Sequence, residues 1–210
     1  MTIDPGDRTP RDIYRLLTGV IVPRPIAFVS TISRDGIRNL APFSFFTAIS
    51  ANPPTICFSP MVRGRQATQK DTLHNIQETR EFVVNVVPET LAEQMNRCSA
   101  DFAPETDEFL ESGLTPVASD LVGAPRVAES PVSMECRLHT MLTISTEPLG
   151  GSLVVGTVVR FHISDDLLAD GAVDPDRLGA IGRMGGTGYV RTRDRFEMPR
   201  PGPPTNLKRT

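Results

Sequence analysis

The sequence lacks any long apolar run and any excess of basic charge. No stretch approaches the roughly 18 consecutive apolar residues of a membrane-spanning helix, and the polar N-terminus has no apolar signal-peptide core. The formal net charge is −3, with acidic and basic residues intermixed, whereas nucleic-acid binding normally needs a basic face. We therefore expect a cytoplasmic protein that binds neither nucleic acid nor membrane. Its 210 residues suffice for a hydrophobic core.

Catalytic and metal-binding motifs are equally scarce. The three cysteines follow no metal or redox spacing, and the three histidines form no ligand pair such as H-x-x-x-H. Neither a P-loop nor a G-x-S-x-G nucleophile turn occurs. The run GRMGGTG, residues 182–188, lacks the spacing and the βαβ setting of a dinucleotide fingerprint. We expect no metal site, and any nicotinamide cofactor must bind in some other way.

Strand-like runs dominate the sequence, and most of them connect locally. These runs are residues 25–33, 55–59, 81–87, 130–145 and 151–164. The last two are predicted to form a hairpin, in which Gly156 indicates a bulge or a tight barrel corner.

Helices are fewer, and they do not alternate strictly with the strands. The pattern predicts them at residues 9–19, 71–80 and 89–98. A doubly wound parallel sheet is therefore disfavoured, and a mainly β fold is predicted, an antiparallel barrel with peripheral helices. We expect a single domain over residues 1–210, with the helix in residues 1–20 and the proline-rich tail 199–210 at its periphery.

The segment NLAPFSFFTAISANPP, residues 39–54, carries no charge although it lies between two predicted strands. Its prolines are predicted to leave part of the backbone outside regular sheet pairing, so that N–H and C=O groups are open to a ligand. A flat heteroaromatic ring with hydrogen-bonding edges would suit such a wall. The alternative interpretation is that Phe43, Phe45 and Phe46 simply belong to the core.

The next loop, residues 59–72, gathers cations and hydroxyls before a helix that Asp71 or Thr72 is predicted to open. Two or three cations, several hydroxyls and a helix N-terminus suit a phosphate monoester. An ordinary solvated loop has the same composition, so both interpretations stay open.

The combined pattern resembles the flavin reductase-like family, the FMN-binding split β-barrel proteins that include flavoredoxin. The motifs that carry this resemblance span PRPIAFVSTISRDGIRNLAPFSFFTAISANPPTICFSP, KDTLHNIQETREFVVNVV, DEFLESGLT, SMECRL, VVGTVVRFHISDD and IGRMGGTGY. Together they cover residues 22–201, and their order and spacing are more specific than any single piece.

The resemblance implies a split barrel of antiparallel strands that binds FMN, usually at or near a homodimer interface. Residues that it places along the flavin ring and ribityl chain are Asn39, Ala41, Pro42, Phe43, Ser44, Phe45, Phe46 and Thr47. Residues that it places near the phosphate are Ser59, Arg65, Lys70 and Thr72, and Asp71 either bonds the ribityl hydroxyls or caps the helix. Three later residues are implied close to the flavin: His162, the candidate catalytic residue, and the substrate candidates Arg183 and Tyr189.

The activity implied is that of an NAD(P)H-dependent oxidoreductase, in which a nicotinamide passes hydride to flavin N5. Reduced flavin would then reach a partner monooxygenase. Two alternatives stay open: an FMN enzyme acting on a specific small molecule, with residues 99–131 helping to form its pocket, and a non-enzymatic flavin-binding protein. Fold alone does not choose among them.

Overall fold

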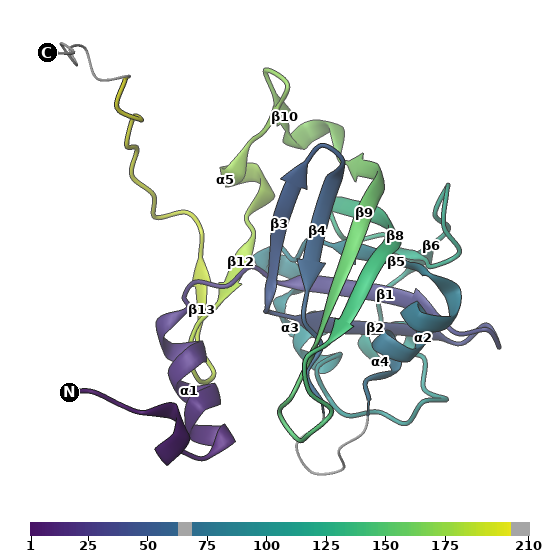
Figure 1. The fold of residues 1–210 in the computed structure, drawn as a ribbon. Coiled ribbons are helices and arrows are strands. Elements are labelled where there is room, and N and C mark those ends of the chain that lie inside the picture. Colours follow the sequence, from purple (N-terminus) through teal and green to yellow (C-terminus); the bar gives the residue numbers. More distant parts are fainter. Residues whose placement is uncertain (63–68, 203–210) are drawn as a thin grey trace, which may run out of the picture.

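A computed structural model describes residues 1–62 and 69–202, and its centre is a seven-stranded antiparallel sheet (Figure 1). The strand order is β2-β1-β5-β8-β9-β4-β3. The strands are β1 (Ala27–Ile32), β2 (Arg38–Phe43), β3 (Phe46–Ala51), β4 (Pro54–Phe58), β5 (Glu81–Asn85), β8 (Val132–Thr143) and β9 (Ser152–Ile163). The predicted antiparallel β fold with peripheral helices is confirmed.

Short elements surround this sheet. Helices are α1 (Pro10–Val20), α2 (Asp71–Thr79), α3 (Ala92–Arg97), α4 (Glu108–Ser112) and α5 (Pro175–Leu178), with 3₁₀ turns at Pro5–Asp7, Glu89–Leu91 and Asp165–Leu167. Two-stranded pairs join β6 (Pro116–Val117) to β7 (Arg126–Val127), β10 (Leu168–Ala169) to β11 (Ala172–Val173), and β12 (Ile181–Arg183) to β13 (Tyr189–Arg191). No helix among residues 1–62 and 69–202 is long and apolar enough to cross a membrane.

The chain passes directly from one edge of the sheet to the other. β2 and β3 are the two edge strands, and only Ser44 and Phe45 separate them. A flat sheet of seven strands would hold its edges about 29 Å apart, whereas the link spans at most about 11 Å. The sheet must therefore curl so that its edges meet at this point, as Figure 1 shows.

The uncharged segment is thus mostly two edge strands, and the parts of its backbone outside regular pairing are the links at residues 44–45 and 52–53 and the free sides of the two edges. Pro42 lies within β2 opposite Phe28 of β1. An edge strand has a neighbour on one side only, so a residue without an N–H can be accommodated. The other side of β2 keeps backbone groups that point away from the sheet.

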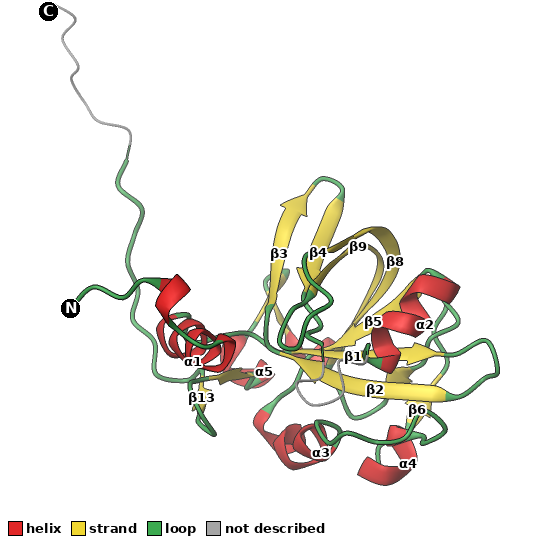
Figure 2. Cartoon of the chain, turned by 60° about the horizontal axis from the view of Figure 1, so that its bottom comes forward, coloured by secondary structure: helices red, strands yellow, loops and turns green. Residues whose placement is uncertain are grey.

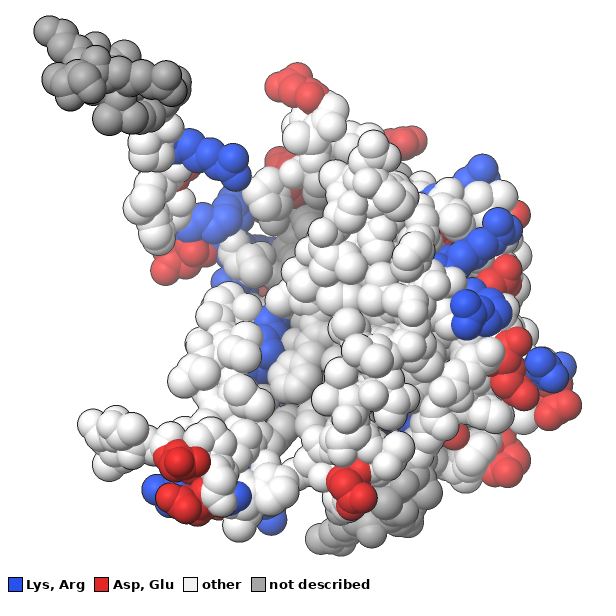
Figure 3. All heavy atoms as spheres, in the orientation of Figure 1, with Lys and Arg blue, Asp and Glu red and all other residues white. Residues whose placement is uncertain are grey.

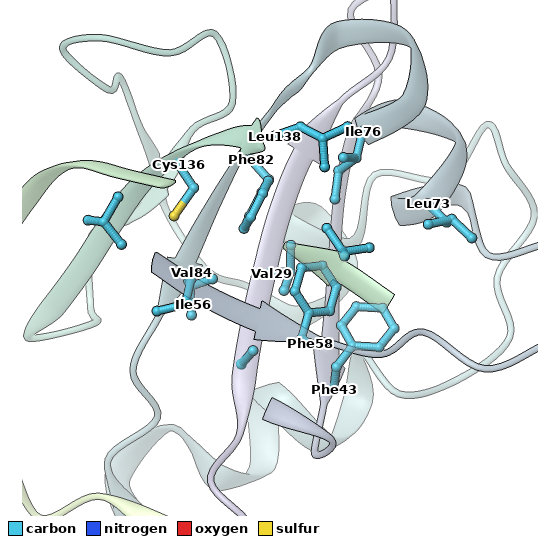
Figure 4. Close-up of a cluster of buried hydrophobic side chains, with 13 residues drawn as sticks. Val29, Phe43, Ile56, Phe58, Leu73, Ile76, Phe82, Val84, Cys136 and Leu138 are labelled. Atoms are coloured by element: carbon cyan, nitrogen blue, oxygen red, sulfur yellow. The ribbon is translucent and has the colours of Figure 1, made fainter. Parts of the chain in front are cut away.

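The curled sheet encloses a hydrophobic core. The Phe58 ring packs between those of Phe43 and Phe82 in tilted and edge-on contacts, with ring centroids 5.2 Å and 5.5 Å apart. Figure 4 shows these rings with Leu73 and Ile76 of α2, which covers one end of the barrel. The expectation that Phe43 belongs to the core is confirmed.

A second cluster fills the opposite face of β1 and β2, where α3 and α4 pack. Phe28 alternates with Ala27 and Val29, so β1 contributes to both clusters and is buried on both faces. Figure 2 shows α3 and α4 beneath β2, with α2 on the other side. These two layers hold β2 between them, although it is an edge strand.

Gly156 lies where the barrel wall is tightest, opposite Leu138 of β8 and Ile56 of β4. The pairing of β8 with β9 shifts register between Leu138 and Thr140, so the predicted bulge exists next to Gly156, with the extra residue in β8. A Cβ at Gly156 would overlap the Phe82 ring, with Cε1 only 2.8 Å away.

We predict that Gly156→Ala destabilises the protein by about 1–3 kcal/mol, because Phe82 is fully buried and its ring has no room to withdraw. Urea unfolding followed by circular dichroism would measure the loss. The control is Gly19→Ala in α1, where a Cβ meets nothing within 4 Å and should raise stability by up to about 1 kcal/mol. Equal stability of the two variants would contradict the prediction.

Candidate functional site

Three hollows adjoin beside β2 and share Pro42, and we call them together the groove. The Arg183 hollow has a volume of about 240 Å³ and borders α1, α3 and β12. The Phe45 hollow measures about 170 Å³, and the Thr72 hollow, at the start of α2, about 60 Å³. Figure 3 shows the surface hollowed between the α1 and β13 side and the barrel, with basic side chains in its wall.

Most of the predicted site residues line this groove. Those that line at least one of the three hollows are Asn39, Ala41, Pro42, Phe43, Ser44, Phe45, Ser59, Lys70, Asp71, Thr72, Arg183 and Tyr189. The structure therefore brings together residues more than 140 positions apart in the sequence. Their roles toward a ligand remain predictions.

Three predicted residues lie elsewhere, namely His162, which is described below, and Phe46 and Thr47. Phe46 packs against the barrel core, and Thr47 is exposed on β3. The cause is the link at Ser44 and Phe45, after which the chain leaves the groove and begins the opposite edge strand. Arg65, with Arg63 and Thr68, lies outside the described residues.

The middle of the groove is mostly aromatic and small polar, with Lys70 at its border. The Phe45 ring lies 6.5 Å from the ring of Tyr14, and both line the Phe45 hollow together with Pro42. Phe43 also borders it, although only 7% of its surface is exposed. The ring surfaces available to a ligand are therefore those of Phe45 and Tyr14 rather than three phenylalanines.

A buried polar network lies beneath the Thr72 hollow. Asn39 accepts a hydrogen bond from the Thr72 hydroxyl at 2.6 Å and donates one from Nδ2 to Glu108 Oε1 at 2.7 Å. Glu108 also accepts from the Leu40 backbone N–H at 3.2 Å. The network fixes α2, β2 and α4 to one another. Burial, together with the nearby negative charge of Asp71, raises the pKa of Glu108 to about 7.

The first turn of α2 faces the same hollow. Its N-cap is Lys70, whose side chain makes no capping bond, and Asp71 is its first residue. This corrects the expectation that Asp71 or Thr72 is the cap. Lys70 Nζ lies 2.8 Å from Asp101, and its side chain is 27% exposed. A helix N-terminus without a side-chain cap, beside a cation, attracts anions.

Behind the Arg183 hollow, next to its lining residue Ser44, lies a residue that the sequence did not reveal. Arg24 is only 4% exposed, and its guanidinium donates to the carbonyls of Thr18, Ile21 and Met184 at 2.6–2.9 Å. It thereby joins α1 to the β12–β13 hairpin. Its sequence signal was an arginine between two prolines directly before a buried strand, which composition alone does not distinguish from an exposed turn.

Helix α3 supplies further lining residues that were not predicted. Met95, Asn96 and the following Ser99 border the Arg183 hollow, and Tyr14 of α1 closes its other side. These residues lie in ordinary amphipathic patterns. No local motif marks such positions, because only the tertiary fold turns them toward β2.

His162 does not line any of the three hollows. Its Nε2 lies 2.5 Å from Oε1 of the fully buried Glu135. Glu135 also accepts the backbone N–H groups of Asp120 and Leu121 at 2.8 Å and 2.6 Å, and Arg160 pairs with Asp120 at 2.6 Å. These bonds hold residues 120–121 against the outer face of the sheet.

A bulge explains this position of His162. Arg160 pairs with Glu135 but Val158 pairs with Cys136, so Val159 is an extra residue in β9. Beyond it, Arg160 and His162 share the face of Glu135. Without the bulge, strict alternation would place both on the inner face with Val158.

Oxygen and nitrogen atoms of Asp120, Glu135 and His162 lie within 4.8 Å of one another, a spacing that could hold a metal ion. However, Arg160 already neutralises Asp120, and Glu135 already accepts two backbone N–H groups. Burial works to raise the pKa of Glu135, but the hydrogen bonds of Asp120, His162 and Leu121 lower it below its usual value. We interpret the cluster as structural, because its bonds hold residues 120–121 against the sheet.

Comparison with known proteins identifies the family. The sequence model of the flavin reductase like domain matches residues 19–178. The chain belongs to the flavin reductase-like family. The resemblance inferred from the sequence motifs is confirmed, and with it membership of a flavin-binding family.

Solved structures agree with this assignment. Nitrilotriacetate monooxygenase component B from Bacillus cereus is 34% identical, with a TM-score of 0.89 over 94% of this chain and 98% of that one. The 2-nitrobenzoate 2-nitroreductase of Pseudomonas fluorescens is 32% identical, with a TM-score of 0.87 over 99% and 100%. A putative flavin reductase with a split barrel domain from Shewanella frigidimarina, 22% identical with a TM-score of 0.81 over 96% and 100%, shares the fold. The predicted split β-barrel is confirmed.

We predict that Glu108 makes stability fall as pH rises. Its pKa is raised on folding, so the folded state holds the proton more tightly, and this stabilisation is lost as pH rises from about 4.5 to about 7. The loss should be on the order of 2–3 kcal/mol. Denaturant unfolding across this range should show a shallower decline for Glu108→Gln than for the wild type. An unchanged slope would refute the assignment.

Proposed function

We propose that the groove binds FMN and that the protein uses it to take hydride from NAD(P)H, as a flavin reductase or a closely related oxidoreductase. The observation that carries the proposal is the charge pattern of the groove. Aromatic and small polar side chains line most of the Phe45 hollow, and Lys70 borders both this hollow and the Thr72 hollow at the start of α2. A neutral tricyclic ring joined to a phosphate has the matching pattern.

The ring would lie along β2 in the Phe45 hollow. β2 is an edge strand, so part of its backbone N–H and C=O groups face away from the sheet. Such groups can meet the polar edge of a flavin without any charged side chain. Pro42, which lines all three hollows, presents a flat apolar surface there.

The phosphate would lie in or beside the Thr72 hollow. Lys70 contributes a cation, α2 contributes its N-terminus, and Ser59 adds a hydroxyl at the neighbouring hollow. Asn39 accepts a hydrogen bond from the Thr72 hydroxyl and so orients the first turn of α2. Arg65, which lies outside the described residues, stays a predicted phosphate contact.

When bound, the flavin would supply the redox chemistry, accepting hydride at N5 from the nicotinamide. The residues of the chain bind and orient. Phe45 and Tyr14 limit water at the middle of the groove, and backbone donors favour negative charge on the reduced ring. No protein acid or base is needed for hydride transfer, so no step is assigned to His162.

A partner that consumes reduced flavin is part of the proposal. The relative from Bacillus cereus is named as a component of a monooxygenase, which supports delivery of reduced flavin to a separate enzyme. A homodimer is proposed as well. Leu17, Val20 and Ile21 are 45–74% exposed on α1 beside the groove, and exposed apolar surface of this kind is typical of an interface.

A second candidate function has its own support. The Arg183 hollow exceeds what the proposed ring and phosphate positions use, and the relative from Pseudomonas fluorescens is named a nitroreductase. The bound flavin would then reduce a specific small molecule. Steady-state oxidation of NADH with increasing free FMN distinguishes the candidates. Bleaching of bound FMN by NADH is expected for both, saturation by free FMN only for the reductase, and a protein that binds no FMN would refute both.

We predict that Lys70→Gln weakens FMN binding about tenfold and riboflavin binding far less, because only FMN carries the phosphate. Quenching of flavin fluorescence measures both affinities. Arg34→Gln is the control, since Arg34 pairs with Glu78 and lies outside the groove. An equal loss for both ligands would mean that Lys70 does not bind the phosphate.

We predict that Leu17→Glu converts a dimer into a monomer, because a charge on the apolar face of α1 would have to be buried at the interface. Sedimentation equilibrium gives the mass directly. Leu110→Glu on α4, where Leu110 is 74% exposed, is the control and should leave the mass unchanged. A wild-type protein that is monomeric throughout would exclude the homodimer.

A further inference from the structure

Two arginines meet at the Arg183 hollow. The backbones of Arg24 and Arg183 form a mutual pair, with N–H to O distances of 2.9 Å and 2.8 Å in the two directions. The two side chains therefore leave the backbone at neighbouring positions. Arg183 lines the hollow, and Arg24 lies behind it. Their charges affect each other, since burial lowers the pKa of Arg24 and the positive charge of Arg183 lowers it further.

Neither arginine has an acidic partner among the residues that the structure describes. Arg24 donates to three carbonyls, which satisfy its N–H groups without cancelling its charge. Arg183 donates to the Gly186 carbonyl at 2.6 Å and stacks on the Tyr189 ring at 4.5 Å. Positive charge therefore accumulates here.

Several other arginines of the chain do have close acidic partners. Arg38 pairs with Asp107 at 2.5 Å, Arg160 with Asp120 at 2.6 Å, Arg191 with Glu89 at 2.6 Å and Arg195 with Asp176 at 2.7 Å. Arg191 is informative because it belongs to the same β12–β13 hairpin. A buried cation without a counter-ion is costly, and a bound anion would offset that cost.

The surrounding surface suits a small anion attached to a ring. Ser44, Asn96 and Ser99 supply polar side chains around the Arg183 hollow, and Tyr14 and Tyr189 supply ring faces. In a partly enclosed hollow the attraction between unlike charges is stronger than in open water. The guanidinium fork matches a carboxylate or a phosphate with two parallel bonds.

We infer that the Arg183 hollow is an anion subsite for the second substrate of the flavin. Arg183 binds a carboxylate or phosphate of that substrate, and Arg24 adds a second positive charge from behind. This inference rests on the proposed function and deepens it. The anion would come from the pyrophosphate of NAD(P)H or from the carboxylate of a small aromatic acid.

The first test compares two reductants of FMN-loaded protein under anaerobic conditions. NADH carries a pyrophosphate, whereas N-benzyl-1,4-dihydronicotinamide carries the same hydride and no anion. Arg183→Met should raise the half-saturating NADH concentration tenfold or more and change that of the uncharged reductant far less. Arg183→Lys should recover part of the loss. Arg191→Met is the matched control, because it removes the same charge from the same hairpin.

The second test needs neither flavin nor turnover. Calorimetric titration of the protein with benzoate and with inorganic pyrophosphate measures the subsite directly. Tighter binding of pyrophosphate than benzoate, lost in Arg183→Met and kept in Arg191→Met, assigns the subsite to the reductant, and the reverse order assigns it to an acidic substrate. The inference is overturned if each anion binds the wild type and Arg183→Met with the same affinity, or if neither anion binds the wild type.

The two tests separate this inference from the proposed function. Wild-type protein that binds no FMN, yet binds either anion through Arg183, would refute the function and keep the subsite. Protein whose flavin is reduced by NADH, but in which Arg183→Met changes neither the preference between the two reductants nor the binding of either anion, would keep the function and refute the subsite.

Discussion

Closure of the sheet by two residues is the constraint on which the rest of the structure depends. Because Ser44 and Phe45 alone connect the two edge strands, the barrel must curl until β2 and β3 meet. The closure places Pro42, Ser44 and Phe45 at the surface, beside the groove. It also frees one side of β2, so that a neutral segment offers backbone groups instead of side-chain charge.

The buried network beneath this segment keeps its geometry. Asn39 connects Thr72 of α2 with Glu108 of α4, and Glu108 also holds the Leu40 N–H of β2. A single carboxylate therefore aligns the strand along which the ring is proposed to lie with the helix end proposed for the phosphate. Burial raises the pKa of Glu108 to about 7, so the charge of this carboxyl group changes close to neutral pH.

Sequence patterns predicted the barrel, the β8–β9 hairpin, the bulge near Gly156 and most of the groove residues. They failed where one residue changed the register. The extra Val159 turns His162 to the outer face with Glu135, and the link at Ser44 and Phe45 carries Phe46 into the core. Arg24 was missed because its role depends only on tertiary contacts. Its partners are carbonyls of α1 and of Met184, 160 positions away.

The charged side chains are distributed unevenly along the groove. Lys70 and the N-terminus of α2 lie toward one end, Arg183 lies in the wall of the other with Arg24 behind it, and Pro42, Phe45 and Tyr14 lie between them. A single ligand with one phosphate accounts for only the first of these charges. The second positive end carries a desolvation cost that the carbonyl partners of Arg24 offset only in part. A second anionic ligand, bound beside the first and in contact with the same neutral wall, would neutralise that end and meet the ring at its exposed face.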